Sequence, residues 1–539
     1  MQNRTEVHRI TLPWGRSEAF LVVFLTWAAI YLPGLGTPEL RGEEGRRILP
    51  AVTMLRTGDW LVPRVGGAPY YRKPPFINWL VAGSFALTGQ QNELSARLPS
   101  VLFLLAFITL LIWLPGDWLR VEARLIATIL LLTTIGVIDK GRQIEIEAVY
   151  LSLTSMAILI WLSLWARGGS RWTLWLVPSL FVAAGLLTKG PPILIFYYIP
   201  IVYILVHAHR RRELLSLPHL VGILLCLGLP ALWAYAAVQA ATAGHAVTGL
   251  SSETIARLSP SALDWPQWAS HVVASFANLL PWVLFTPLLW RRDFVDSISR
   301  THLSLFQGAR LGLVLAFLAI TLIPGNGGRY GLPAAGLESI LLGWVLAEVG
   351  ELPDTGRLWR RSAIAGYLLA IAAAAVGLIS LRRDIGSAVL LWGTVWLTVV
   401  LVRRRGVFRT PVPLALLSAA LAAVLMLQYV LFVPPLMQRQ EKHRPAAALV
   451  NALVPNQEPL YIYKPDYQDF LFYLRAPVEY LVEPAQVDGR LHFLLVRESA
   501  YQQLKDEPAL AAHPGKTLCR FTYWTHGDFR LLELLTETP

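Results

Sequence analysis

Two adjacent carboxylates, Glu43 and Glu44, lie in the stretch LRGEEGRR at residues 40–47, together with three arginines. The stretch directly follows an apolar run that ends near residue 36. Ionisable groups at a membrane boundary are costly to hold there and tend to mark functional sites. A carboxylate in such a place can accept a proton from an attacking hydroxyl. We therefore treat Glu43 and Glu44 as candidate catalytic residues.

Further charged side chains occur in the segments between later apolar runs. Lys and Arg at such positions can neutralise a departing phosphate, while a carboxylate serves as the base. This combination suits group transfer from a donor with a phosphate leaving group and a lipid tail. The charged residues are Lys73, Glu145, Glu147, Lys189, Arg257 and Arg329.

The composition predicts a polytopic α-helical membrane protein. Of the 539 residues 55% are hydrophobic and only 15% are charged, which is too few polar residues to cover soluble domains. The net charge of +12 is concentrated in short arginine clusters between apolar segments. Such clusters are typical of cytoplasmic loops, so we predict a topological role and no nucleic-acid partner. Two cysteines cannot form a thiolate metal site.

The arginine bias also predicts the topology. It favours thirteen crossings with a cytoplasmic N-terminus and an external C-terminus, provided that residues 76–89 lie along the outer interface as a juxtamembrane helix. The predicted spans are 18–36, 97–115, 123–138, 148–166, 172–187, 191–208, 218–238, 268–290, 309–324, 332–350, 362–381, 387–402 and 411–433.

The C-terminal region differs in kind from the rest of the chain. From residue 435 to 539, short alternating runs are interleaved with amphipathic stretches, which predicts a small external α/β domain. We therefore divide the chain into a transmembrane domain at 1–434, which includes a first external loop at 37–96, and an external domain at 435–539.

Five motifs together carry a resemblance to a known family. The sequence resembles the bacterial relatives of the protein O-mannosyltransferases, and among them the aminoarabinose transferases that modify lipid A (ArnT-like). The motifs occur in the family's order and cover most of the membrane part. They are TGDWLVPRVGGAPYYRKPP followed by ELSARLPS (57–100), LLTKGPP (186–192), LPWVLFTP (280–287) and RYGLP (329–333).

The resemblance implies a membrane-embedded glycosyltransferase of the GT-C type in a bacterial inner membrane. Its donor would be a polyprenyl-phosphate sugar, with undecaprenyl phosphate as the expected lipid. Its acceptor would be a lipid A-like glycolipid, another glycan or a protein. The positions that match family site residues are Glu43 at the catalytic Asp, Glu44 after it, Glu147 at the second-loop acid, and Lys73, Arg257 and Tyr330 around the phosphate.

The sequence departs from the family pattern at three positions. Glu43 replaces Asp and lengthens the arm by one methylene. Arg72 stands where the aminoarabinose transferases have a metal-contacting Glu, so no metal or other cofactor is expected. Asn326 stands where the family often has Lys, and Arg329 can compensate.

The mechanism that these residues suggest is a single inverting displacement. Glu43 would orient and deprotonate the acceptor hydroxyl, and Lys73 with its cationic neighbours would bind the leaving phosphate. Glu147 would position Lys73 or the acceptor. GNGGRYG (325–331) lacks the context of a nucleotide-binding loop and is predicted to be a mobile external loop. Two alternatives stay open: a lipid or sugar transporter, and a non-catalytic binder of lipid-linked sugar.

Overall fold

The computed structural model describes residues 14–240, 264–348, 393, 411–438, 441–465, 467–487, 491–505, 515–523 and 527–534. These residues fall into two compact units, which we describe separately. We call residues up to 35 and 97–435 the membrane unit, and residues 36–96 and 436–539 the loop–sheet unit.

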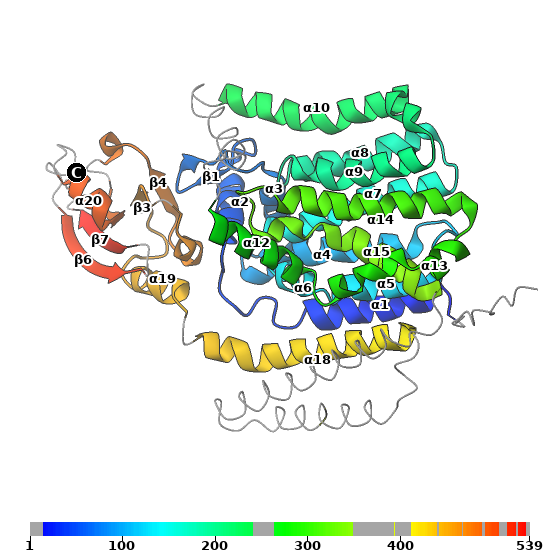
Figure 1. Cartoon of the computed structure of the whole chain (residues 1–539). Helices are drawn as coiled ribbons and strands as arrows, with labels where there is room; N and C mark the ends of the chain where they lie inside the picture. The colour runs from blue at the N-terminus through cyan, green and yellow to red at the C-terminus, as the bar shows by residue number, and fades with distance from the viewer. Residues whose placement is uncertain are drawn as a thin grey trace, which may run out of the picture. The chain divides into compact units, whose positions relative to one another are not determined.

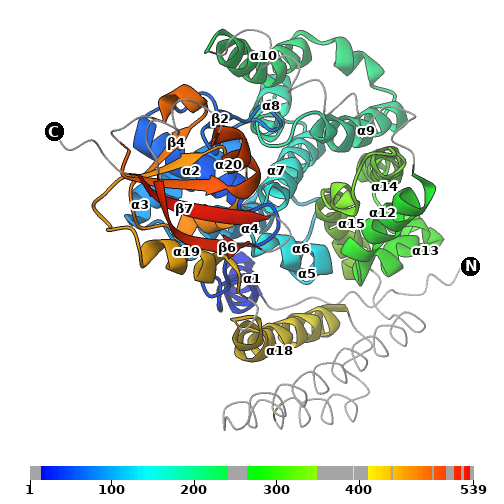
Figure 2. The same ribbon diagram turned by 90° about the vertical axis from the view of Figure 1, so that its left-hand side faces the viewer.

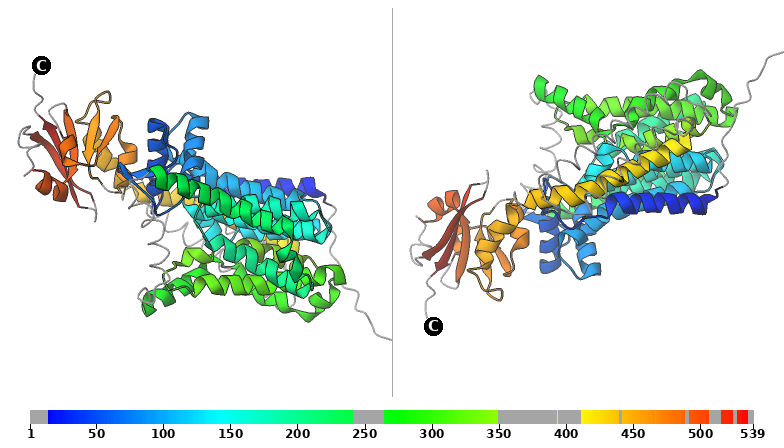
Figure 3. Two further views of the ribbon diagram at one scale, coloured as in Figure 1. Left: turned by 90° about the horizontal axis from the view of Figure 1, so that it is seen from above. Right: turned by 90° about the horizontal axis from the view of Figure 1, so that it is seen from below.

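Long apolar helices make up the membrane unit, and they run side by side along a roughly common direction (Figure 1; Figure 3). Two of them, α4 and α18, extend a few residues beyond the unit. The elements are α1 (Arg16–Tyr31), α4 (Glu93–Trp113), α5 (Val121–Leu132), α6 (Ile135–Gly141), α7 (Ile146–Ala166), α8 (Arg171–Leu186), α9 (Pro192–His207), η1 (Arg211–Leu215), α10 (Leu217–Ala240), α12 (Trp265–Asn278), η3 (Trp282–Trp290), α13 (Arg292–Ser297), α14 (Arg300–Thr321), η4 (Gly328–Gly331), α15 (Ala334–Glu348) and α18 (Pro411–Gln438).

Membrane-crossing length is reached by only some of these helices. Within the described residues, four helices are long and apolar enough to cross, or six if each of two bent pairs counts as one span. The predicted spans at 362–381 and 387–402 lie outside the described residues. Thirteen crossings therefore stay a prediction.

Two of the predicted spans are bent rather than straight. The span predicted at 123–138 divides into α5 and α6 at an angle of 66°, and that at 268–290 into α12 and η3 at 81°. Pro281 at the second break has no N–H to continue the helical ladder. At the first break, the hydroxyls of Thr133 and Thr134 donate to carbonyls of the preceding turn, which competes with regular helix bonding.

Glycines bring α14 into close contact with α9. A Cβ on Gly308 would lie 2.4 Å from the Cα of Ile204, and one on Gly312 would lie 2.3 Å from the Cα of Pro200. The two glycines are four residues apart and thus share one helix face. Small residues at this spacing allow the backbones of membrane helices to approach closely.

We expect Gly312→Ala to destabilise the protein by about 1–3 kcal/mol, because the added methyl overpacks a backbone contact. Gly228→Ala on α10 is the matched control, since no atom lies within 4 Å of the position of its Cβ. Thermal unfolding in detergent measures both. Equal unfolding temperatures for the two variants would contradict the proposed packing.

The loop–sheet unit is built on a five-stranded mixed sheet with the order β4-β3-β5-β7-β6 (Figure 2). Strands β4, β3 and β5 are parallel, while β7 pairs antiparallel with both β5 and β6. The elements are α2 (Gly45–Thr57), β1 (Arg64–Val65), β2 (Ala68–Pro69), α3 (Phe76–Thr88), α19 (His443–Asn451), β3 (Leu460–Tyr463), η6 (Asp469–Tyr473), β4 (Val478–Leu481), η7 (Pro484–Gln486), β5 (Phe493–Arg497), α20 (Glu498–Leu504), β6 (Gly515–Thr522) and β7 (Asp528–Leu534).

Both faces of this sheet are covered. Phe493 and Leu495 of β5 join the core with α19 and η6, whereas Leu494 and Val496 join the core with α20. The alternation follows from the period of two in a β-strand. Because both faces are covered, residues of both orientations are apolar, and β5 is a nearly continuous apolar run.

Residues 36–96 cluster with the sheet rather than with the membrane helices. The carboxylate of Glu39 accepts hydrogen bonds from the backbone N–H groups of Lys442 and His443 at 2.9 and 3.0 Å. Leu49 of α2 belongs to the core beside α19. The observed division therefore differs from the predicted one, which placed the loop at 37–96 in the transmembrane domain.

Candidate functional site

Two buried carboxylates lie at the N-terminus of α7. Glu145 is the N-cap residue, in an extended conformation, and Glu147 lies in the first turn. Their exposed fractions are only 3% and 4%. The positive end of the helix dipole stabilises negative charge there. The motif IEIE thus positions both acids by starting a helix.

The motif TKGPP positions a lysine opposite these acids. The chain leaves α8 with the backbone N–H of Lys189 bonded to the carbonyl of Gly185 at 3.0 Å. Gly190 then adopts a φ of 94°, which favours glycine, and the following prolines begin α9. This turn places the Lys189 ammonium 3.1 Å from Glu147.

The short helix η4 adds an arginine and a tyrosine. The Arg329 guanidinium contacts Glu145 at 3.2 Å and Glu147 at 3.3 Å. The Lys189 ammonium lies 3.8 Å from the centre of the Tyr330 ring, at cation–π distance. A Cβ on Gly328 would lie 2.5 Å from Ala274, so glycine lets η4 press against α12. The segment predicted to be a mobile loop therefore contains a packed helical turn.

Lys140 completes this group at 3.3 Å from Glu145. We call Lys140, Glu145, Glu147, Lys189 and Arg329 the charged cluster. Burial, followed by the neighbouring Glu147, raises the pKa of the Glu145 carboxyl, while Lys140 and Arg329 act in the opposite direction. The Arg329 side chain is 39% exposed, whereas both carboxylates are buried. Arg329 is thus the group through which an anion can reach the cluster.

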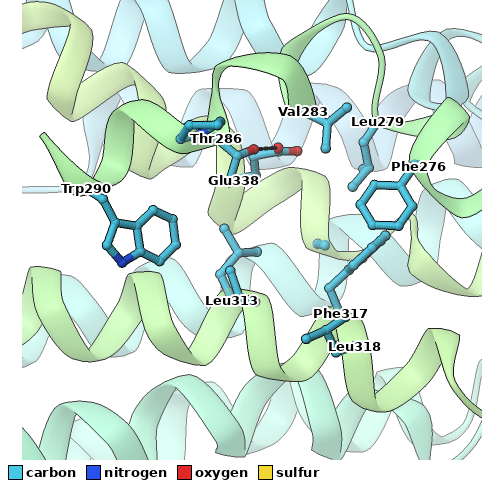
Figure 4. A pocket seen from close by; sticks show the side chains of 12 residues that line it. Phe276, Leu279, Val283, Thr286, Trp290, Leu313, Phe317, Leu318 and Glu338 are labelled. Carbon is cyan, nitrogen blue, oxygen red and sulfur yellow. Dashed lines mark hydrogen bonds between the residues drawn. The ribbon is translucent and has the colours of Figure 1, made fainter.

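An apolar pocket of about 500 Å³ is lined by residues of α12, η3, α14 and α15 (Figure 4). The short helix η4 packs against Phe317 of the pocket wall. A Cβ on Gly331 of η4 would lie 2.7 Å from the Phe317 ring. Phe276 and Trp290, which also line it, are 43% and 45% exposed. The lining residues are Phe276, Leu279, Val283, Thr286, Pro287, Trp290, Leu313, Val314, Phe317, Leu318, Ala334 and Glu338.

One carboxyl interrupts the apolar wall of this pocket. The hydroxyl of Thr286 donates to Glu338 at 2.7 Å, and Figure 4 shows the two side chains facing each other. Glu338 is only 4% exposed. The pocket therefore suits an apolar chain, with a single polar pair on its wall.

In the loop–sheet unit, Glu43 is held by two arginines of α2, the helix that follows it. Its carboxylate accepts from Arg46 at 2.8 Å and lies 3.8 Å from Arg47. The side chain of Glu43 is 29% exposed. Glu44 is fully buried, and its carboxylate accepts from the backbone N–H of Arg41 at 2.9 Å. Glu43 thus faces solvent in part, whereas Glu44 closes the turn that precedes α2.

Residues of η6 and the segment before it brace this turn. A Cβ on Gly45 would lie 1.9 Å from the carboxylate of Asp469, so only glycine fits at the start of α2. The Tyr467 hydroxyl donates to Asp469 at 2.6 Å and to the carbonyl of Gly42 at 3.1 Å. Burial and then the charge of Asp469 raise the pKa of Tyr467. These contacts were not predicted from the sequence, because more than 400 residues separate Tyr467 from Gly42.

The structure brings some of the predicted site residues together in the membrane unit, and others belong to the loop–sheet unit. Glu147, Lys189, Arg329 and Tyr330 converge within the membrane unit. Lys140 was not predicted, although its position five residues before Glu145 was a signal. The predicted residues of the loop–sheet unit are Glu43, Glu44 and the half-buried Lys73, and Arg257 lies outside the described residues.

Part of the chain matches a family model, and several curated proteins are similar to it. Residues 72–235 match the model for dolichyl-phosphate-mannose-protein mannosyltransferases. The undecaprenyl phosphate-alpha-4-amino-4-deoxy-L-arabinose arabinosyl transferase of Pseudomonas aeruginosa (strain LESB58) is 25% identical over 69% of this chain and 67% of its own length. The protein of the same name from Pectobacterium carotovorum is 27% identical over 66% of this chain and 65% of its own length.

Solved structures share the fold over nearly the whole chain. ArnT from Cupriavidus metallidurans bound to undecaprenyl phosphate matches 98% of this chain and 100% of its own, with a TM-score of 0.68 and 18% identity. The apo state of ArnT matches 97% of this chain and 99% of its own, with a TM-score of 0.62 and 18% identity. The chain is thus similar in sequence to these arabinosyl transferases and, over residues 72–235, to the mannosyltransferase family, and it shares the fold of the solved ArnT structures.

We expect Lys189→Met to destabilise the protein by about 3–5 kcal/mol, because it leaves the buried Glu147 without its closest cation. The double variant Lys189→Met/Glu147→Gln removes both charges and should recover a large part of this loss. Thermal unfolding of the wild type, Lys189→Met, Glu147→Gln and the double variant in detergent measures the coupling. If the double variant lost the sum of both single effects, the buried pair would not be coupled as described.

Proposed function

We propose that this protein is a glycosyltransferase that moves a sugar from a polyprenyl phosphate to an acceptor. The observation that carries the proposal is the charged cluster with its exposed Arg329, whose helix η4 also packs against Phe317 of an apolar pocket, in a chain with an ArnT-like fold. A phosphate requires cations and a polyprenyl chain requires apolar walls. The membrane unit supplies both within a few residues of η4.

The relatives support the choice of donor. The curated arabinosyl transferases are named for an undecaprenyl-phosphate sugar, and the solved ArnT is bound to undecaprenyl phosphate. We infer that undecaprenyl phosphate is also the lipid here. The acceptor would be a glycolipid of the lipid A type, another glycan or a protein.

In the proposed reaction, the acceptor hydroxyl attacks the anomeric carbon and inverts it. The bond between that carbon and the phosphate oxygen breaks, and its electron pair leaves with the polyprenyl phosphate. Glu43 takes the proton of the hydroxyl. Lys73 and Arg329 stabilise the leaving phosphate with charge-assisted hydrogen bonds, and Tyr330 contributes a neutral one. Arg257 belongs to this set by its match to the family pattern alone.

The buried acids have a supporting role in this proposal. Glu147 orients Lys189 and Arg329, to which it is paired, and its negative charge compensates for the burial of the Lys189 ammonium. The cations would carry the phosphate without a metal, since the family resemblance implies a metal-contacting Glu at the position that Arg72 occupies here. We place the reaction on the external face of a bacterial inner membrane, with the N-terminus in the cytoplasm.

Binding of the leaving lipid is the first test. Undecaprenyl phosphate at 100 times its Kd should raise the free energy of unfolding of the wild type by about 2.7 kcal/mol. Lys73→Ala should lose this gain, because it removes a cation that binds phosphate. Lys505→Ala, an exposed lysine of the same unit, should retain it. An intact wild-type protein without any shift would refute the donor site.

Glu43→Gln distinguishes an enzyme from a binder. As a general base Glu43 contributes roughly 100-fold or more, so the variant should lose at least that factor in turnover while still binding undecaprenyl phosphate. Release of undecaprenyl phosphate from a panel of its sugar conjugates, followed by mass spectrometry, gives the rate. Glu479→Gln, an exposed acid on β4, is the control. Unchanged turnover in Glu43→Gln would remove Glu43 from the chemistry.

A further inference from the structure

The membrane unit has a second cavity, lined by charged and polar residues, with a volume of about 550 Å³. Its lining has four guanidiniums and one carboxylate, which leaves an excess of three positive charges. We call it the basic pocket. It is lined by Arg171, His209, Arg210, Arg211, Arg212 and Glu213.

The basic pocket lies at the opposite end of the helices from the charged cluster. Helix α8 begins at Arg171, and Lys189 follows its other end. Helix α7 begins beside Glu147, and Trp165 near its other end has the Arg210 guanidinium 5.2 Å from its ring centre. A helix of 21 residues is about 30 Å long. The two sites are therefore separate.

Two of the arginines organise the pocket around a buried acid. The Arg171 guanidinium contacts the Glu213 carboxylate at 2.5 and 2.9 Å, and Arg210 contacts it at 2.8 Å. The side chain of Glu213 is only 3% exposed. Although burial opposes ionisation, the two guanidiniums hold the pKa of Glu213 below its usual value. This arrangement fixes the turn before η1.

The other two arginines are left for a ligand. Arg211 and Arg212 are exposed, and within the described part of the chain neither forms an ion pair. His209 before them has a φ of 54°, an uncommon conformation for a residue other than glycine. A topological signal needs only positive charge in a loop. It does not require the charges to converge on one cavity around a buried carboxylate.

An apolar stripe continues from the basic pocket along α10. Leu217, Leu220 and Leu224 are 63%, 50% and 71% exposed, and their spacing places them on one helix face. Leu215, in η1 itself, is 78% exposed. Of the helices that can cross the membrane in the described residues, α10 has the least buried apolar window, at 22%. The cations and the apolar stripe together are complementary to a lipid with an anionic headgroup and apolar chains.

We propose that the basic pocket binds the phosphate headgroup of an anionic phospholipid, whose acyl chains lie along the leucine stripe of α10. Basic pockets between membrane helices bind such headgroups, and anionic lipids are enriched in the cytoplasmic leaflet. The orientation predicted from the arginine bias places this end of the helices in that leaflet. The ligand is a structural lipid of the surrounding membrane and is distinct from the polyprenyl donor.

The test titrates the full-length protein in detergent with phosphatidylglycerol and follows both thermal unfolding and bound lipid by native mass spectrometry. Arg211→Gln and Arg212→Gln should each weaken binding about fivefold, and the double variant about 25-fold. Both side chains are exposed, so the fold should persist. Arg291→Gln/Arg292→Gln removes two charges from another loop and should leave the affinity unchanged.

Three outcomes would overturn the proposal. Equal weakening in the Arg291→Gln/Arg292→Gln control would show diffuse attraction rather than a pocket. Equal stabilisation by phosphatidylcholine would show that the anionic phosphate is not recognised. Displacement of phosphatidylglycerol by an equal concentration of inorganic phosphate would show that the site binds free phosphate and that the leucine stripe contributes nothing to the affinity. A test with undecaprenyl phosphate on the same variants keeps this site separate from the donor, because neither arginine should affect it.

Discussion

The cost of burying charge at the edge of a membrane governs the organisation of the membrane unit. Glu145 and Glu147 are tolerated because a helix N-terminus and three cations surround them. Each of these cations comes from a different element, so the ion pairs tie α6, the turn after α8 and η4 to the start of α7. Removing one partner would leave the others as uncompensated charges. The charges therefore determine how the ends of these helices meet.

Close packing of the helices makes that arrangement possible. Gly308 and Gly312 let α14 approach α9, and Gly331 lets η4 contact Phe317. The same wall borders the apolar pocket. The position of Arg329 is thus a consequence of glycine spacing in two segments, in addition to its ion pairs. The short helix η4 links the polar cluster to the apolar pocket, because it carries Arg329 and also packs against Phe317.

In the loop–sheet unit, an analogous constraint acts on the segment that holds Glu43. Asp469 leaves no room for a side chain at Gly45, and Tyr467 bonds to the carbonyl of Gly42. These contacts give the C-terminal residues a structural role in orienting the loop at 40–47. The proposed chemistry at Glu43 thus depends on residues more than 400 positions away.

The sequence by itself was enough to predict the membrane class and the positions of the described helices. It also indicated most of the charged residues at the helix ends as candidate site residues. Apolar windows and arginine bias are local signals, because a helix crosses lipid on its own hydrogen bonds. The strands of the sheet were also predicted from local patterns, as short alternating runs. The pairings of Lys189 and Arg329 with Glu147 were not, and neither were the bends at Thr133 and Pro281.

Only the tertiary structure decided which charges neutralise one another and which remain open to a ligand. It set Glu44 apart as a buried turn residue, joined residues 36–96 to the sheet, and gathered the cations at 209–212 with Arg171 around one acid. Ion pairs and cavities form between elements that are distant in the chain. Their geometry depends on helix packing at the level of single methyl groups, which no local pattern of residues records.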